Sequence, residues 1–283
     1  MNILITGCTG FIGSNILNKF KNNNKIFVIL RNKKKNKIFN HKNIKKIFYN
    51  DYNNLCKKLS KIKVDLVIHA ATHYAKEHNV KDLEKFTNSN ILLGNIILEN
   101  VINMKVKKFI NFSTIWEDYY GIKDNYFNLY SAYKKAFSKI LNFYKKKISS
   151  IKFYELMISD TFGENDKRRK IINVLKKNYK NNKVTKIISR KLFINLLNVE
   201  DVVNAVFLIS MNDIKSGKYL LKNKFNFNMF ELVKKFNKKN KKKLKVKWIN
   251  NFKVDDKSLS YNKLKSWKPI KSNIKDVINN IKG

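Results

Sequence analysis

Cysteine and proline are nearly absent from this sequence. Two cysteines and one proline occur among 283 residues, and Cys8 and Cys56 form neither a disulfide framework nor a metal-ligand pattern. No apolar run reaches the length needed to span a membrane. The first residues read as a strand, so we expect no signal peptide. These absences predict a reduced, cytoplasmic, globular protein.

Acidic residues are also few, with 20 Asp and Glu against 61 Lys and Arg, for a net charge of +41. A charge of this size is typical of proteins that bind nucleic acid or anionic membranes. However, lysine is spread along the whole chain, as compositional bias in an AT-rich genome would produce. We therefore expect neither nucleic acid nor membrane as a partner. The length and the hydrophobic fraction of 43% indicate one large domain or two smaller ones.

Glycine is scarce too, yet three of the 8 glycines lie within seven residues. They follow an apolar strand (1–6) and precede a stretch with helical spacing (14–20). A glycine turn in this position lets the backbone approach a diphosphate and points a helix N-terminus at its charge. The sequence therefore predicts a dinucleotide site, to which we assign Gly7, Thr9, Gly10, Phe11, Ile12 and Gly13.

Strands and helices then alternate along the chain. This alternation predicts an α/β fold with a doubly wound parallel sheet of the Rossmann type, whose strand ends share one ligand-binding crevice. We expect residues 1–160 to form this dinucleotide-binding domain, with parts of 190–215 returning to it, and 161–283 to form mainly a smaller C-terminal substrate-binding lobe. The expected strands are 25–30, 44–49, 64–71, 107–112, 192–197 and 217–221, and the expected helices are 52–62, 81–104, 171–180, 200–211 and 228–238.

The end of the second strand favours a particular cofactor. Arg31 stands where NAD-binding proteins usually carry an acidic residue for the ribose 2′-hydroxyl. With Lys33, Lys34 and Lys35 behind it, Arg31 would attract a 2′-phosphate. We therefore predict NADP as the cofactor, with NAD as the alternative.

Further cofactor contacts are expected at the ends of later strands and on the helix that follows. Asp51 could either meet the adenine or cap the helix over 52–62. His69 and His73 have no carboxylate or cysteine at ligand spacing beside them, so we predict no metal site. The residues assigned to this part of the cofactor site are Asp51, Tyr52, Ala70, Ala71, Asn90 and Lys134.

A tyrosine and a lysine at helical spacing carry the chemistry. Tyr130 and Lys134 share one helix face, and the lysine charge, with a cationic nicotinamide, would lower the pKa of the phenol. Ser113 or Thr114, at a strand end, would hold the substrate oxygen. Tyr119 has the same spacing to a lysine, but Gly121 interrupts that stretch, which reads as a loop. We assign Thr114, Tyr130 and Lys134 as catalytic.

These motifs together resemble the extended short-chain dehydrogenase/reductases, the NAD-dependent epimerase/dehydratase family that acts on nucleotide sugars. Segments 160–166, 196–202 and 264–269 also look like the family's substrate loop, late-helix segment and C-terminal tryptophan element. The resemblance implies substrate contacts from Ser113, Trp116, Asp160, Thr161 and Arg168. Residues 113–116 and 128–137 look most like the CDP-abequose synthase type, which are 4-ketohexose reductases.

One departure from the family narrows the reaction. Sugar-nucleotide 4,6-dehydratases carry an Asp-Glu pair directly after the catalytic threonine, where this chain has Ile115 and Trp116. We therefore expect an NADP-dependent reductase of a 4-keto-(di)deoxyhexose nucleotide sugar, CDP-linked, for dideoxysugar and surface polysaccharide biosynthesis. A nucleotide-sugar 4-epimerase with tightly held NAD and a non-catalytic nucleic-acid-binding member are the alternatives. A homodimer through helices 81–104 and 128–147 is also expected.

Overall fold

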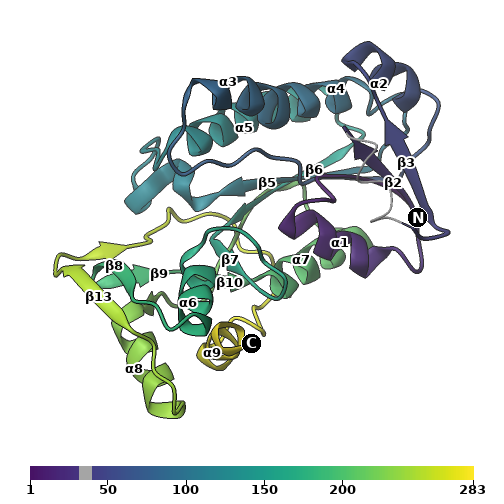
Figure 1. Ribbon diagram of the computed structural model, residues 1–283. Coiled ribbons are helices and arrows are strands. Elements are labelled where there is room, and N and C mark those ends of the chain that lie inside the picture. Colours follow the sequence, from purple (N-terminus) through teal and green to yellow (C-terminus); the bar gives the residue numbers. More distant parts are fainter. Residues whose placement is uncertain (32–39) are drawn as a thin grey trace.

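A parallel sheet of seven strands forms the centre of the computed structural model, which describes residues 1–31 and 40–283 (Figure 1). Its strands are β1 (Asn2–Thr6), β2 (Lys25–Leu30), β3 (Ile44–Phe48), β4 (Leu66–His69), β5 (Lys108–Thr114), β6 (Lys152–Ile158) and β11 (Gly217–Leu221). Their spatial order is β11-β6-β5-β4-β1-β2-β3. After β3 the chain returns to the other side of β1, so two crossovers diverge there and leave a binding crevice at the strand ends. The predicted fold class is confirmed.

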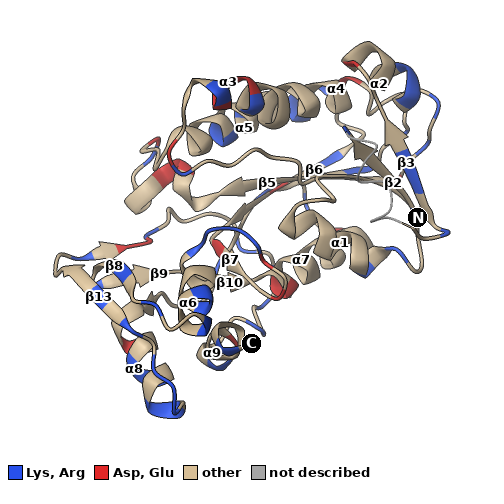
Figure 2. Cartoon of the chain, viewed as in Figure 1, with Lys and Arg blue, Asp and Glu red and all other residues tan. Residues whose placement is uncertain are grey.

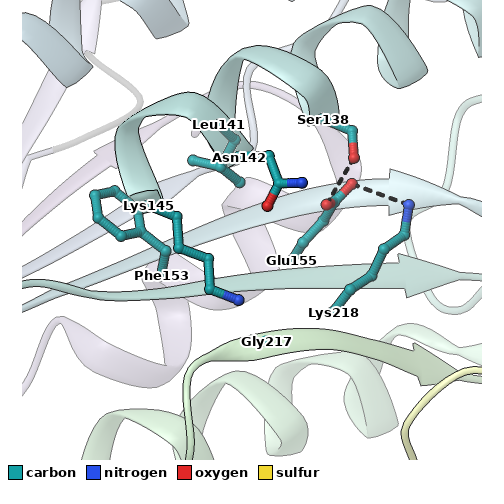
Figure 3. A pocket seen from close by; sticks show the side chains of 8 residues that line it. All are labelled: Ser138, Leu141, Asn142, Lys145, Phe153, Glu155, Gly217 and Lys218. Atoms are coloured by element: carbon teal, nitrogen blue, oxygen red, sulfur yellow. Dashed lines mark hydrogen bonds and ion pairs between the residues drawn. The ribbon is translucent and has the colours of Figure 1, made fainter. Parts of the chain in front are cut away.

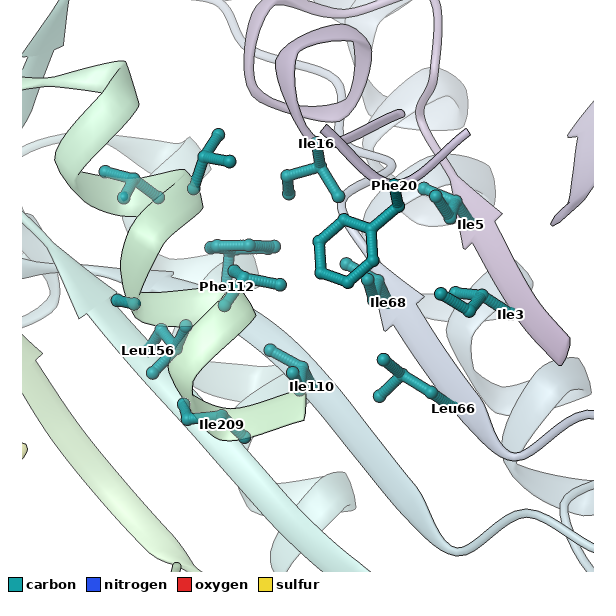
Figure 4. Close-up of a cluster of buried hydrophobic side chains, with 14 of the residues drawn as sticks. Ile3, Ile5, Ile16, Phe20, Leu66, Ile68, Ile110, Phe112, Leu156 and Ile209 are labelled. Atoms are coloured by element: carbon teal, nitrogen blue, oxygen red, sulfur yellow. The ribbon is translucent and has the colours of Figure 1, made fainter. Parts of the chain in front are cut away.

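Helices cover both faces of this sheet (Figure 1). On one face, α1 (Phe11–Phe20) and α7 (Val199–Met211) lie side by side over a buried apolar cluster that includes Ile5, Phe20 and Ile209 (Figure 4). Because neither face meets water, the central strands are apolar along their length. The opposite face is covered by α2 (Tyr52–Leu59), α3 (Val80–Phe86), α4 (Leu93–Glu99) and α5 (Leu129–Lys147).

A smaller lobe lies beside the carboxyl ends of the sheet strands (Figure 1). Its core includes Phe162, Leu175, Leu232 and Phe236. The helices and strands of this lobe are β7 (Asp160–Phe162), α6 (Ile171–Lys180), β8 (Thr185–Ser189), β9 (Leu192–Ile194), β10 (Leu196–Asn198), β12 (Phe227–Asn228), α8 (Met229–Lys239), β13 (Val246–Asn250), β14 (Val254–Asp255) and α9 (Ile274–Lys282). Two elements from the second half of the chain return to the sheet domain. The helix α7 packs on one face of the central sheet, and β11 is one of its strands. The division at residue 160 stays a prediction.

Several expected boundaries are wrong by a few residues. The helix expected over 81–104 ends at Glu99, and its middle is a π-helix, η2 (Thr87–Leu92). The helix expected from residue 14 begins at Phe11, because Gly10 is its extended N-cap and the glycine turn leads directly into the first helical turn. The helix expected over 52–62 ends at Leu59. The strand expected over 192–197 is split into β9 and β10.

Asp201 fastens the C-terminal segment to the sheet domain. It is buried in the first turn of α7, and its carboxylate accepts hydrogen bonds from the backbone N–H groups of Ile270 and Lys271 and from the Ser272 hydroxyl. Its backbone carbonyl accepts one from Trp267 Nε1 at 2.9 Å. Two of the sequence segments that resemble the family therefore meet in one cluster.

Asp201→Ala is expected to lower the free energy of unfolding by about 2–4 kcal/mol, because it leaves buried N–H donors without an acceptor. Denaturant unfolding measures this change. The matched control is Glu200→Ala, whose side chain is exposed on the same turn and whose effect should stay within about 0.5 kcal/mol. Equal losses of unfolding free energy in the two variants would contradict the role of Asp201 in holding the C-terminal segment.

Lysine and arginine occur on the sheet domain and on the small lobe alike, and lysine is densest from α8 into β13, where residues 234–247 include nine lysines (Figure 2). The expectation that nucleic acid is not a partner stays a prediction. None of the helices among residues 1–31 and 40–283 combines the length and the apolar character that crossing a membrane requires.

Candidate active site

The glycine turn packs so closely against neighbouring backbone that two of its glycines leave no room for a Cβ atom. A Cβ on Gly7, where φ is +71°, would lie 2.5 Å from the carbonyl carbon of Ala70, and one on Gly13 would lie 2.2 Å from the Gly7 oxygen. Gly10 differs, because a Cβ there would meet only the Gly7 oxygen, at 3.2 Å. The loop is therefore tight on its protein side and open at Gly10, directly before α1. This open space at a helix N-terminus fits a dinucleotide diphosphate.

The far end of the cofactor site is formed by β2 and the residues after β3. Arg31 is exposed at the end of β2, and its charge opposes the rise that burial causes in the pKa of Tyr49 and Tyr52. These side chains therefore share one edge of the sheet. Asp51 caps α2 by accepting from Asn54 N at 2.8 Å, which is the second of its two expected roles. Lys33, Lys34 and Lys35 lie outside the described residues.

The segment after β4 is held by polar contacts from two elements. Ala71 N donates to Thr6 Oγ1 at 3.0 Å. Asn90 is buried in the π-helix η2. It accepts a hydrogen bond from His73 N at 2.6 Å and donates one to the His73 carbonyl. His69 hydrogen-bonds to Thr6 Oγ1, and His73 pairs with Asp82. Asn90 therefore shapes the loop that carries Ala70 and Ala71, and both histidines have protein partners.

The three catalytic candidates come from neighbouring elements. Thr114 ends β5, and its hydroxyl oxygen accepts from Trp116 N at 3.3 Å, which leaves the hydroxyl hydrogen available. Tyr130 and Lys134 lie on α5, which begins with a capping box at Asn128. Lys134 is buried, and Tyr130 is partly buried against the ring of Tyr74 at 5.1 Å.

Burial dominates the protonation of this group in the cofactor-free structure. It raises the pKa of the Tyr130 phenol above its ordinary value, and the Glu117 charge raises it further. Burial lowers the pKa of the Lys134 ammonium to about 8, although the charges of Glu117 and Glu155 oppose the fall. The expectation that Lys134 and a cationic nicotinamide together lower the tyrosine pKa concerns the cofactor-bound protein and stays a prediction.

Tyr119 belongs to an irregular turn, as expected. It lies in η3 (Ile115–Gly121), where Asp118, Tyr119 and Tyr120 have non-helical dihedral angles. The following Gly121 has a φ of +70°. Tyr119 and Lys123 therefore do not share a helix face, and Tyr130 stays the candidate proton donor.

Aromatic and basic side chains surround the expected sugar position. Trp116 packs on Tyr74 and Phe127. The ammonium of Lys170 lies 3.9 Å from the centre of the Trp116 ring and 2.7 Å from an Asp160 oxygen. The sequence pattern gave no signal for Tyr74, since it stands alone in a loop.

The remaining substrate candidates already have partners in the described structure. Arg168 donates to Asp166 and to the hydroxyl of Thr161, and its guanidinium lies 4.3 Å from the centre of the Phe11 ring. This places Arg168 beside the glycine turn. The Ser113 hydroxyl donates to Glu117. Among Ser113 and Thr114, Thr114 is therefore the one with a hydroxyl hydrogen to offer a substrate.

A row of polar side chains crosses the sheet beneath α5, and the sequence did not reveal it. Strand register places Thr6, His69, Asn111, Glu155 and Lys218 opposite one another on five adjacent strands. These residues lie far apart in the sequence, on five different strands, so no local pattern reveals the row. Buried Glu117 joins the row through Lys218, at 3.0 Å.

Comparison with known proteins gives one family match, curated relatives and similar folds. The sequence pattern of the NAD dependent epimerase/dehydratase family matches residues 3–221. The chain is 27% identical over 223 residues to a CDP-abequose synthase of Yersinia pseudotuberculosis, covering 77% of this chain and 76% of that protein. Its fold is similar to UDP-glucose 4-epimerase of Thermotoga maritima, with a TM-score of 0.77, 21% identity and coverage of 99% and 97%. The UDP-glucuronic acid 4-epimerase of Bacillus cereus gives a TM-score of 0.79, 18% identity and coverage of 99% and 97%. At these identities the solved structures show a shared fold alone.

Proposed function

This chain belongs to the NAD dependent epimerase/dehydratase family, and from that premise we propose that it reduces the 4-keto group of a nucleotide-linked deoxyhexose. The broader class of this protein is that of NAD-dependent enzymes that modify nucleotide sugars. The observation that carries the finer proposal is the Thr114, Tyr130 and Lys134 group beside an apolar Ile115-Trp116 pair. NADPH is the proposed reductant, in a biosynthetic route to surface sugars.

The protein's own residues supply the proton and hold the oxygen. When bound, the cofactor supplies hydride. Tyr130 donates its proton to the developing alkoxide, and Thr114 donates a hydrogen bond to the same oxygen. The buried Lys134 ammonium stabilises the phenolate that Tyr130 leaves behind. Tyr74 and Trp116 exclude water from one side of the reacting carbon.

Dehydration is a weaker proposal, because acid and base groups are missing at the right place. Ile115 and Trp116 carry none. Carboxylates do follow at Glu117 and Asp118, yet both are engaged. Glu117 binds Lys218, while Asp118 accepts from Lys135 at 2.9 Å and from Tyr261 at 2.5 Å. Neither is therefore free to remove a proton from the sugar.

The deciding experiment measures cofactor content and turnover together. Purified protein should carry little bound NAD and should consume NADPH stoichiometrically with a 4-keto-deoxyhexose nucleotide. A panel of CDP-, dTDP-, UDP- and GDP-linked substrates is used, with CDP favoured by the relative from Yersinia. Full NAD occupancy, together with interconversion of C4 epimers without added cofactor, would instead establish the 4-epimerase alternative.

Arg31→Asp is expected to shift preference from NADP toward NAD. The new carboxylate repels a 2′-phosphate and accepts a hydrogen bond from a free 2′-hydroxyl. The change in the ratio of the two kcat/KM values should be at least about tenfold, equal to about 1.4 kcal/mol. Arg190→Asp, on the small lobe over Phe230, is the control with equal charge change. An unchanged ratio in Arg31→Asp would show that Arg31 does not face the cofactor.

We also propose a homodimer through α3–α4 and α5, which lie side by side on one face of the sheet (Figure 1). Leu83 and Phe143 on these helices are exposed in the single chain. Light scattering that returns the mass of one chain would contradict this proposal.

A further inference from the structure

Three charged side chains form a group beneath α5 in which the two carboxylates are buried and Lys218 is 20% exposed. Lys218 Nζ lies 3.0 Å from a Glu117 oxygen and 3.3 Å from a Glu155 oxygen. Ser138 donates to the second Glu155 oxygen at 2.8 Å, and Ser113 donates to Glu117. Glu117 is fully buried, and the Glu155 residue is 7% exposed. We call Glu117, Lys218 and Glu155 the buried triad.

The fold brings this triad to the catalytic lysine from three different elements. Register pairs Lys218 on β11 with Glu155 on β6. Glu117 comes from η3, three residues beyond Thr114. Ser138, which donates to Glu155, lies on α5 one helical turn after Lys134. The charges of Glu117, Glu155 and Lys218 all act on Lys134. The proposed reaction uses none of these triad residues directly.

The charges of the triad and of Lys134 balance. Lys218 brings one positive charge to two carboxylates, which leaves one negative charge in excess. Lys134, buried in the same region, supplies the missing positive charge. A buried ammonium without a counter-charge would lose its proton, since desolvation penalises the charged form. The triad is thus the counter-charge of Lys134.

Other titratable groups near this region do not supply that charge. Burial lowers the pKa of His69 on β4 to about 3, and the Lys134 charge lowers it further, so the ring is neutral at working pH. The Tyr74 ring packs edge-to-face on Tyr130, and the Arg168 charge acts on Tyr130. Burial raises the pKa of Glu117, and Lys218 and Ser113 oppose the rise by donating to its carboxylate. These two donors stabilise the carboxylate form of Glu117.

We propose that the buried triad keeps Lys134 protonated while Tyr130 gives up its proton. Glu117 and Lys218 are then positioning residues whose charges act on Lys134 in opposite directions. The proposal rests on the reductase function proposed above. It goes beyond that function by assigning the charge of Lys134 to residues that contact neither substrate nor cofactor.

A cavity lies beside the triad. It measures about 120 Å³ and is lined by Ser138, Asn142, Lys145, Glu155 and Lys218, among others (Figure 3). This volume has room for water, which needs about 30 Å³ per molecule. Glu155 and Lys218, which line the cavity, are therefore less fully desolvated than Glu117.

Two variants separate electrostatics from structural damage, because both break the same ion pair. Glu117→Gln removes a negative charge, so the pKa of Lys134 should fall from about 8 by about one unit or more. Lys218→Met keeps the apolar stem and removes a positive charge, so the same pKa should not fall. A purely structural role would move both variants alike.

The pKa of Lys134 can be followed with and without turnover. In the cofactor-free protein, a ¹³C NMR titration of lysine Cε reports it, and Lys134→Arg identifies the resonance by its loss. With NADPH and substrate, the alkaline limb of the kcat profile should move to lower pH in Glu117→Gln, because reduction needs the cationic lysine. Asp213→Asn is the control. It removes a carboxylate that pairs with Lys152, at the opposite end of β6.

The outcomes are separable. The triad's role is supported if the pKa of Lys134 falls in Glu117→Gln, does not fall in Lys218→Met and is unchanged in Asp213→Asn. A fall of this pKa in both triad variants, or an unchanged pKa in Glu117→Gln, would overturn it. Absence of turnover with every 4-keto substrate would count against the reductase function and would leave the NMR result standing.

Discussion

Tyr130→Phe is expected to lower kcat by about 10² to 10⁴, the usual contribution of a positioned general acid. The substitution removes only the phenol oxygen. The ring can still pack edge-to-face on Tyr74, so the fold and the cofactor site should remain intact. Because Thr114 keeps its hydrogen bond to the substrate oxygen, KM should change much less than kcat.

Steady-state kinetics with NADPH and the best 4-keto substrate measures this loss. Tyr119→Phe is the matched control, since Tyr119 lies on η3 and also precedes a lysine by four residues. We expect near-normal turnover in that variant. The reverse result, with activity lost in Tyr119→Phe and kept in Tyr130→Phe, would show that the proton donor has been assigned to the wrong tyrosine.

Gly13→Ala is expected to damage both the fold and the cofactor site. The new Cβ would lie 2.2 Å from the Gly7 oxygen and 2.6 Å from the Gly7 carbonyl carbon, so backbone must move. We expect the free energy of unfolding to fall by about 2–4 kcal/mol. Dinucleotide affinity should fall by at least about tenfold, because the glycine turn that approaches the diphosphate is displaced.

Gly10→Ala provides the comparison. Its Cβ would meet one protein atom at 3.2 Å and otherwise project into open space. Stability should thus change little, while the methyl group would occupy space needed by the diphosphate. Thermal unfolding and fluorescence titration with NADPH measure the two effects separately. If Gly10→Ala binds NADPH normally, the diphosphate does not lie over this turn.

The sequence alone determined the first five strands of the sheet, because their signals are local, but it did not place β11 beside them. Strand, glycine turn and helix follow one another within the first 20 residues, and parallel crossovers then bring the strand ends together. Tyr130 and Lys134 could be paired from their spacing, since helix geometry fixes their relation. Boundaries were less certain. The π-helix over Thr87–Leu92 has no distinct sequence signal, so this interruption of the predicted helix was missed.

Only the tertiary structure decided which charged residues surround the proposed catalytic group. Glu155 and Lys218 are 63 residues apart in sequence and meet because β11 pairs with β6 in a particular register. Glu117 follows the strand end that the sequence identified, yet its role depends on a lysine 101 residues later. In a chain with 61 basic residues, no spacing rule selects one lysine. Burial selects it, because a carboxylate removed from water requires a partner and an exposed one does not.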